Sequence, residues 1–165
     1  ALLAPSSIVL DQDWGLDHGL WCLLAHLFPQ ADVPVVQLSL DVGLGAADHY
    51  ALARRLRPLR DAGVLIVASG NIVHNLGRMD WRHPEAVADW AQRFNDRVRA
   101  HLERAEHAAL LSLDGTDADN AVPTPEHYWP MLYAAALADA GRVHGCGLRL
   151  HKGNTAHVRD AGPLS

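Results

Sequence analysis

Short apolar runs alternate with helical patterns along the first half of the chain. The runs cover residues 8–10, 34–40 and 64–67, and the second run ends at the polar residue Asp41. Between the second and third runs, residues 46–62 carry apolar side chains at intervals of three and four, as on one face of a helix. This alternation predicts an α/β fold in which a mostly parallel or mixed central sheet has helices on both faces.

Capping and proline signals indicate where the early helices begin and end. Asp17 can cap a helix that ends before Pro29. Pro58 lies inside the helical pattern of residues 46–62. Because proline lacks a backbone donor and clashes with the preceding turn, we expect a kink there or a break into two helices.

The second half of the chain shows two further helical patterns. Apolar spacing predicts a long helix over residues 84–106, then a polar loop over 114–125 and an apolar helix over 126–140. Residues 141–165 show no convincing alternation. We therefore expect one domain over residues 1–140, followed by an irregular tail.

Composition narrows the class of protein. A chain of 165 residues, 49% hydrophobic and 20% charged, can bury one sizeable core. No run approaches the roughly 18 apolar residues of a membrane helix, and no signal peptide is visible, so we expect a cytoplasmic protein without a membrane partner. The net charge of -5 gives no basic face, which argues against nucleic acid.

Three histidines lie where an α/β fold gathers its ligands. His74 closely follows the third apolar run, after the small residues Ser69 and Gly70. Ligands of open α/β sheets bind beyond the carboxyl ends of the strands. His18 stands at the start of the first predicted helix, and His127 lies in a proline-rich turn. We expect these three side chains to converge on one metal or acid/base site.

The same features are also consistent with ordinary packing. Taken singly, His18 and His127 could each be a helix cap or a packed side chain, and Trp14 and Trp129 beside them could wall a pocket or fill a core. No HExxH, P-loop or GxSxG motif occurs. The remaining histidines lie on predicted helix faces or in the tail, and we expect them at the surface: His26, His49, His83, His101, His107, His144, His151 and His157.

Four segments carry a family resemblance, in this order along the chain: WGLDHG (14–19), VVQLSLD (35–41), LIVASGNIVHN (65–75) and PTPEHY (123–128). Together they resemble the 4,5-DOPA dioxygenase group of the class III extradiol ring-cleaving dioxygenases. The resemblance implies that residues 1–140 form part of a catalytic α/β domain. It implies a non-haem Fe(II) enzyme, with Zn(II) as the alternative metal, that opens a catechol with O2 to a muconic semialdehyde-type product.

The resemblance also implies roles for the three histidines. His127 would be a metal ligand at the substrate pocket, and His74 would be the catalytic base beside the metal or a second ligand. His18 would donate a hydrogen bond to the substrate or to bound oxygen. Fe(II) accepts imidazole nitrogens and leaves positions open for catecholate and O2, while a neutral histidine can take a catechol proton.

The chain departs from the family pattern at both ends. The family carries two further histidine ligands in an N-terminal part, in a GHGSP-like turn and an AHW-like strand end, and this chain contains neither. We therefore expect a sheet that is incomplete at the N-terminus, and association with that N-terminal segment or with another copy of the chain. The tail has no counterpart of the family's closing motif.

Two other functions stay open on the sequence. The same histidines could serve a zinc-dependent hydrolase, or the chain could be a non-catalytic fragment or degenerate binding module. We favour the dioxygenase, whose partners are a small catecholic substrate and O2.

Overall fold

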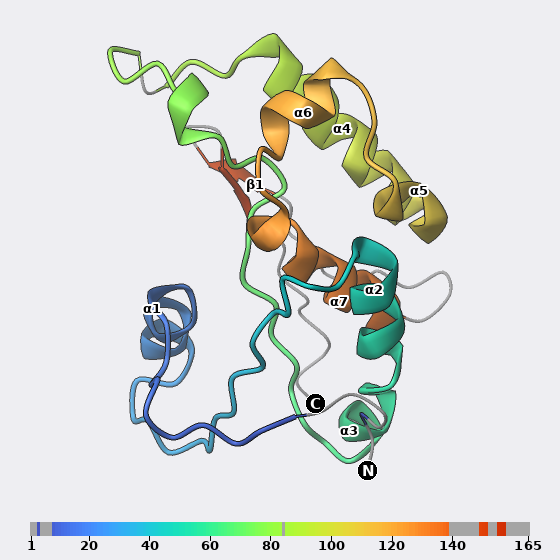
Figure 1. The fold of residues 1–165 in the computed structure, drawn as a ribbon. Coiled ribbons are helices and arrows are strands. Elements are labelled where there is room, and N and C mark those ends of the chain that lie inside the picture. The colour runs from blue at the N-terminus through green and yellow to red at the C-terminus, as the bar shows by residue number, and fades with distance from the viewer. Residues whose placement is uncertain (1–2, 4–7, 84, 139–148, 152–154, 158–165) are drawn as a thin grey trace.

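The computed structural model describes residues 3, 8–83, 85–138, 149–151 and 155–157, the last two ranges by their backbone only (Figure 1). Its elements, in chain order, are α1 (His18–Leu27), α2 (Ala46–Arg54), α3 (Arg57–Asp61), the 3-10 turn η1 (Leu76–Arg78), α4 (Asp89–Glu103), α5 (His107–Leu111), α6 (Thr116–Ala121), the 3-10 turn η2 (Pro125–His127), α7 (Trp129–Leu137), β1 (Arg149–His151) and β2 (Thr155–His157). None of the described helices is long and apolar enough to cross a membrane.

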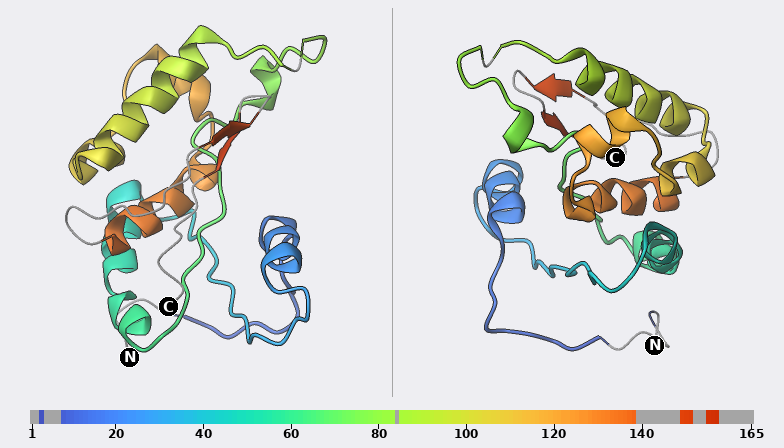
Figure 2. Two further views of the ribbon diagram at one scale, coloured as in Figure 1. Left: turned by 180° about the vertical axis from the view of Figure 1, so that it is seen from behind. Right: turned by 45° about the horizontal axis from the view of Figure 1, so that its top comes forward.

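Helix α7 is the centre of the packing. One face contributes Leu132 to a cluster that α4 completes with Phe94 and Val98. Another face contributes Tyr133 and Leu137 to a smaller cluster against α2. A helix that is apolar all round is typically buried on all sides, and α7 follows that rule. Figure 2 shows α4 and α6 on one side of α7 and α2 on the other, while α1 stands apart from the other helices.

The predicted local boundaries are confirmed in the N-terminal half. The Asp17 side chain accepts a hydrogen bond of 2.9 Å from the backbone N–H of Leu20, and α1 ends before Pro29. The helical pattern of residues 46–62 is broken into α2 and α3, with Pro58 in the first turn of α3. Proline is tolerated in a first turn because that turn's donors have no helical partner in any case.

Two predictions for the second half were wrong, one about the start of a helix and one about a loop. The long helix starts at Asp89 rather than at residue 84, because the carboxylate of Asp80 binds the backbone of Arg82 and the ring of His83 and favours a turn there. The loop predicted over residues 114–125 contains α6.

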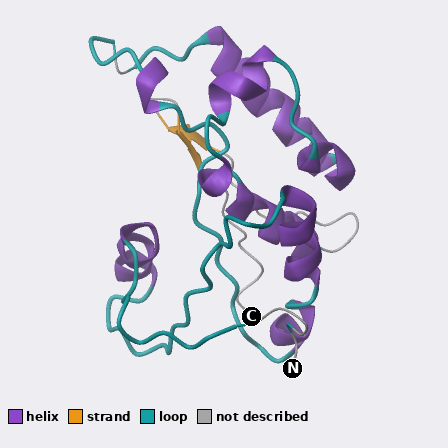
Figure 3. Ribbon diagram, in the orientation of Figure 1, coloured by secondary structure: helices purple, strands orange, loops and turns teal. Residues whose placement is uncertain are grey.

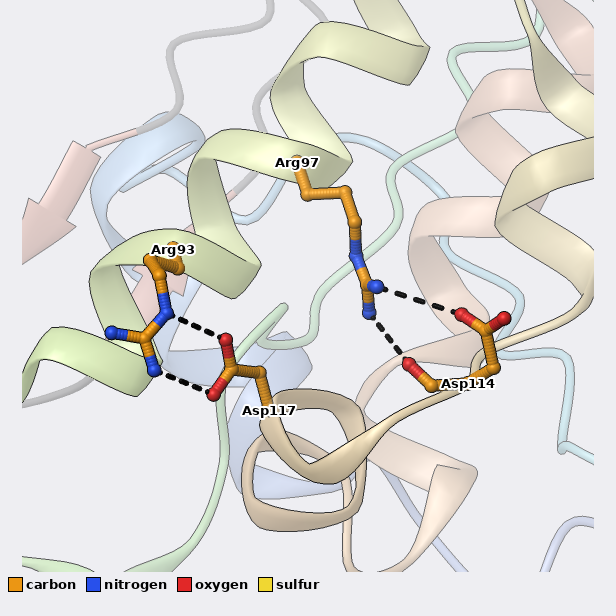
Figure 4. Close-up of polar contacts among 4 residues, drawn as sticks. All are labelled: Arg93, Arg97, Asp114 and Asp117. Atoms are coloured by element: carbon orange, nitrogen blue, oxygen red, sulfur yellow. Dashed lines mark hydrogen bonds and ion pairs between the residues drawn. The ribbon is translucent and has the colours of Figure 1, made fainter.

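Helix α6 is stabilised by contacts with α4 that cannot be predicted from the sequence of α6 alone. Ala118 and Ala121 are buried against the cluster that α4 lines. Asp117 receives two hydrogen bonds of 2.8 Å from the guanidinium of Arg93 (Figure 4). A second arginine, Arg97, contacts both the carboxylate and the backbone carbonyl of Asp114. These pairs hold α6 along α4.

The expected central sheet does not form within the described residues. The apolar runs 8–10, 34–40 and 64–67 have no strand assignment there and appear as connecting segments in Figure 3. A strand needs a hydrogen-bonded neighbour, and these runs instead leave large side chains in solvent, with Val9 81% and Val36 86% exposed. The sheet that the described residues contain is the antiparallel pair β1 and β2, where Arg149 faces His157. Both strands lie within residues 141–165, and the rest of that segment lies outside the described residues.

Candidate functional site

The backbone that carries His74 is held by the segment that carries His127. The His74 N–H donates to the carbonyl of Ala121 over 2.8 Å, and the Asn75 side chain donates to the carbonyl of Asn120 over 2.7 Å. The Asn71 N–H donates to the carbonyl of His127, also over 2.7 Å. Residues 71–75 and 120–127 are therefore joined at both ends, and we call this arrangement the histidine clamp.

Two buried apolar residues connect the clamp to the hydrophobic core. Ile72 and Val73 are fully buried in the cluster around α4 and α7, directly before His74. Burial of two such side chains fixes the backbone on either side of them. His74 itself stays half-buried at the edge of this cluster.

Gly70 permits the closest backbone approach in the clamp. A Cβ atom at this position would lie 2.4 Å from the carbonyl oxygen of His127 and 3.1 Å from Cγ of Pro130. Such distances are far below van der Waals contact, so only a residue without a side chain lets the two segments meet. In the structure Gly70 thus serves the close approach of one backbone segment to another.

The rings of His74 and His127 stack on each other. Their centroids are 3.5 Å apart and their planes make an angle of 27°. Glu126 lies beside them, with a carboxylate oxygen 3.8 Å from Nε2 of His127, and accepts a hydrogen bond of 2.7 Å from the hydroxyl of Thr124. Two imidazoles and one carboxylate thus form the polar group at the end of the clamp.

The electrostatics of this group favour a neutral His74. Burial lowers its pKa first, and the neighbouring His127 lowers it further, while Glu126 acts in the opposite direction. For Glu126, burial is the largest influence and raises the pKa. The Thr124 hydrogen bond, the local backbone and the two histidines together outweigh burial, so that the pKa is lowered. An ionised carboxylate beside a neutral imidazole is suited to accepting and holding a proton.

His18 is placed near the clamp without entering it. It begins α1 and is exposed, and the described residues show no ring contact between His18 and either of the other two histidines. The following residue, Gly19, accepts a hydrogen bond of 2.9 Å from the hydroxyl of Ser69, close to the histidine clamp. Convergence of all three histidines therefore stays a prediction. Trp14 is 79% exposed, whereas Trp129 is buried.

The described residues do not by themselves fit a metal centre. They contain no group of three or more histidine, cysteine or acidic side chains placed to hold an ion. Within the clamp the stacked pair supplies two imidazoles, and an ion in a facial site needs at least one further protein ligand.

A cavity of about 260 Å³ lies elsewhere, between α4, α5 and the residues that follow α5. Arg97, His101 and Asp114 line it, and His74 and His127 do not. It is separate from the histidine clamp, and its arginine is already paired with Asp114.

The histidine clamp lies within a segment that matches a known protein family. Residues 4–151 match the family described as the catalytic LigB subunit of aromatic ring-opening dioxygenase. The chain belongs to the LigB family. The predicted resemblance to extradiol ring-cleaving dioxygenases is thereby confirmed at family level.

Individual LigB relatives agree with this assignment. The chain is 43% identical to the 4,5-DOPA dioxygenase extradiol of Escherichia coli K12, covering 84% of this chain and 53% of that protein. It is 37% identical to the protein of the same name from Beta vulgaris, covering 83% of this chain and 53% of that one. The chain thus spans about half the length of the curated relatives it matches.

A solved structure gives the fold. The crystal structure of an uncharacterized protein from Escherichia coli K12 matches with a TM-score of 0.84 at 39% identity, over 95% of this chain and 67% of that chain. The LigB-type α/β dioxygenase fold is supported by this likeness, although the central sheet is not formed in the residues described here.

Sequence reasoning misplaced one histidine and overlooked one acid. His49 was expected at the surface and is fully buried, because it continues the inward face of α2 one turn before Ala53. That spacing of four residues was visible in the sequence. Glu126 had no signal beyond its place next to His127. The described structure leaves His26 and His83 exposed as predicted and half-buries His101 and His107. The side chains of His144, His151 and His157 lie outside the described residues.

Proposed function

We propose that this chain forms part of an extradiol dioxygenase that opens a small catecholic ring with O2 to a muconic semialdehyde-type product. The observation that carries the proposal is the stacked pair of His74 and His127, at the end of a clamp whose residues lie within the LigB match. Both relatives described above bear the name 4,5-DOPA dioxygenase extradiol, which makes a DOPA-like catechol the first substrate to test.

In this proposal His127 and His74 have different chemical roles. His127 is the ligand candidate and His74 is the base that takes a proton from a catechol hydroxyl, or else a second ligand. The lowered pKa of His74 supports the role of base, because a neutral imidazole is needed to accept a proton near neutral pH. His18 would complete the substrate pocket as a hydrogen-bond donor once α1 packs closer to the clamp.

The cofactor in this proposal is Fe(II), with Zn(II) as the alternative. Because the stacked pair supplies too few converging ligands, the proposal assigns the remaining ligands to the N-terminal part that the family resemblance implies. The same part would pair with residues 34–40 and 64–67 as strands of the central sheet. It would also cover the apolar side chains that these runs expose. A cytoplasmic location and self-association stay predictions.

The test joins the chain to the N-terminal segment of the Escherichia coli relative and loads the product with Fe(II) without oxygen. O2 uptake is then measured with a panel of catechols, DOPA included, and the ring-opened product is followed by absorbance. Catechol-dependent uptake supports the proposal. Ester or amide hydrolysis without O2 consumption would point to a zinc hydrolase instead, and failure to retain any metal would point to a non-catalytic binding module.

A further inference from the structure

We propose that His49 is a positioning residue, which holds α7 where it sets His127 against His74. The proposal rests on the proposed function in one respect, since the site it serves is the one assigned to that reaction. It assigns a task to a buried histidine that lies outside the histidine clamp.

The hydrogen bonds of His49 join three parts of the chain. The ring is fully buried on α2, with Nε2 3.0 Å from the carbonyl oxygen of Asp41 and Nδ1 3.0 Å from the hydroxyl of Tyr133. A carbonyl oxygen only accepts, so Nε2 carries a hydrogen, and in the neutral ring Nδ1 accepts the Tyr133 hydroxyl hydrogen. Burial raises the pKa of Tyr133, which keeps that hydroxyl protonated and able to donate.

The ring of His49 also packs on the first residue of α7. Its centroid lies 4.3 Å from the Trp129 ring, with 36° between the planes. Trp129 and Tyr133 are one helical turn apart on the same face of α7, so His49 contacts that helix at two successive turns. Trp129 follows His127 by two residues, and a displacement of this end of α7 therefore carries His127 with it.

The polar character of this contact is what suggests positioning. An apolar side chain could fill the space between α2 and α7, but it would let α7 slide along or rotate about its axis. Directed hydrogen bonds in a buried site permit one arrangement, because a shifted helix leaves buried polar atoms without partners. Through its hydrogen bond to Asp41, the same ring also links α7 to the end of the segment 35–41, one of the four family motifs.

The test compares two tyrosines whose hydroxyl groups each bond to Nδ1 of a histidine. Tyr133 of α7 bonds to His49 of α2, and Tyr50 of α2 bonds to His107 of α5. Tyr133→Phe removes the hydroxyl that bonds to His49, and Tyr50→Phe removes the hydroxyl that bonds to His107 over 2.6 Å. The second variant is the control, since it makes the same chemical change away from the clamp. His49→Phe removes both ring hydrogen bonds, and His49→Gln restores a donor and an acceptor in the same space.

Two readouts separate this proposal from the proposed function. The first is the NMR signal of the ring Cε1–H groups of His74 and His127 in the chain itself, which ring stacking makes sensitive to displacement. The second is kcat of the iron-loaded fusion with DOPA. We expect Tyr133→Phe and His49→Phe to move both ring signals and to lower kcat by roughly tenfold or more at nearly constant KM. His49→Gln should recover part of the loss, and Tyr50→Phe should change neither readout.

Each result has a consequence. Ring signals that stay unmoved in Tyr133→Phe, which is the mildest variant, would overturn the positioning role even if His49→Phe failed to fold. Equal shifts in Tyr50→Phe would overturn it as well, because they would show a general loss of stability. Shifted ring signals in a fusion that never consumes O2 would support positioning while overturning the proposed dioxygenase.

Discussion

Replacing Gly70 with alanine should open the histidine clamp. The added Cβ would lie 2.4 Å from the His127 carbonyl oxygen, and real Cβ contacts under 3.0 Å are essentially never seen, so the backbones must separate by at least about 0.6 Å. The clashing atom is a backbone oxygen rather than the end of a flexible side chain. Cγ of Pro130 would also lie only 3.1 Å from the added Cβ, so the methyl group has no free side to turn to. Local rotation therefore cannot relieve the clash.

The magnitude follows from two effects. Forcing a methyl group into a filled space typically costs about 1–3 kcal/mol of unfolding free energy. Separation of the two backbones also strains the 2.7 Å hydrogen bond from Asn71 to His127, and loss of such a bond contributes about 0.5–1.5 kcal/mol. We expect Gly70→Ala to lose about 2–4 kcal/mol in total and to move the ring signals of His74 and His127.

Urea unfolding of matched variants measures the effect. Gly77→Ala is the control, because its Cβ would meet nothing closer than 3.4 Å and glycine to alanine changes at relaxed sites are neutral or stabilising by about 0.4–1 kcal/mol. The midpoint should fall in Gly70→Ala and hold or rise in Gly77→Ala, with the same m-value in both. If the two variants were equally stable, the close approach of residues 70 and 127 would be refuted.

Three further outcomes are expected. His74→Ala in the iron-loaded fusion should lower turnover by about a hundredfold with iron retained; loss of iron would make His74 a ligand, and unchanged turnover would remove it from the mechanism. Calorimetry of the chain alone should find no submicromolar Fe(II) or Zn(II) binding, since the stacked pair offers too few converging ligands, and tight binding would contradict this. Burial lowers the folded-state pKa values of His74 and His107 below the ordinary value of 6.5. The unfolded chain then binds protons more readily, so unfolding free energy should decrease as pH falls through 6.5 towards those lowered values, and His107→Gln should flatten that slope in urea titrations.

What could be predicted from the sequence was local in origin. Asp17 caps α1 through an atom three residues away, and Pro58 breaks a helix through its own ring, so neighbouring residues suffice to anticipate both. The family motifs likewise pointed to His74 and His127, because each motif is a continuous stretch of chain. These predictions needed no knowledge of what packs against what.

What could not be predicted depends on distant partners. Helix α6 is held by Arg93, which lies 24 residues from Asp117. Without that contact, a polar sequence with one glycine and two prolines in or beside it is typical of a loop. The apolar runs have strand-like composition, yet strand formation needs a neighbour that the described residues do not supply. For His49 the helical spacing to Ala53 indicated the inward face of α2, but the hydrogen bonds to Tyr133 and Asp41 that satisfy the buried ring come from distant parts of the chain.

The histidine clamp is built by the helical layer and not by the sheet. His74 is held by carbonyl groups at the end of α6 and by Ile72 and Val73 in the cluster of α4 and α7, while the run 64–67 before it makes no strand in the described residues. The geometry of the two rings should therefore survive whatever pairing the apolar runs adopt in a longer polypeptide. Addition of the N-terminal segment would then be expected to bring ligands to a pair that is already in place, so the ring signals of His74 and His127 should change little in the metal-free fusion. A large change would show instead that the sheet, and not α6 and α7, determines where the two histidines stand.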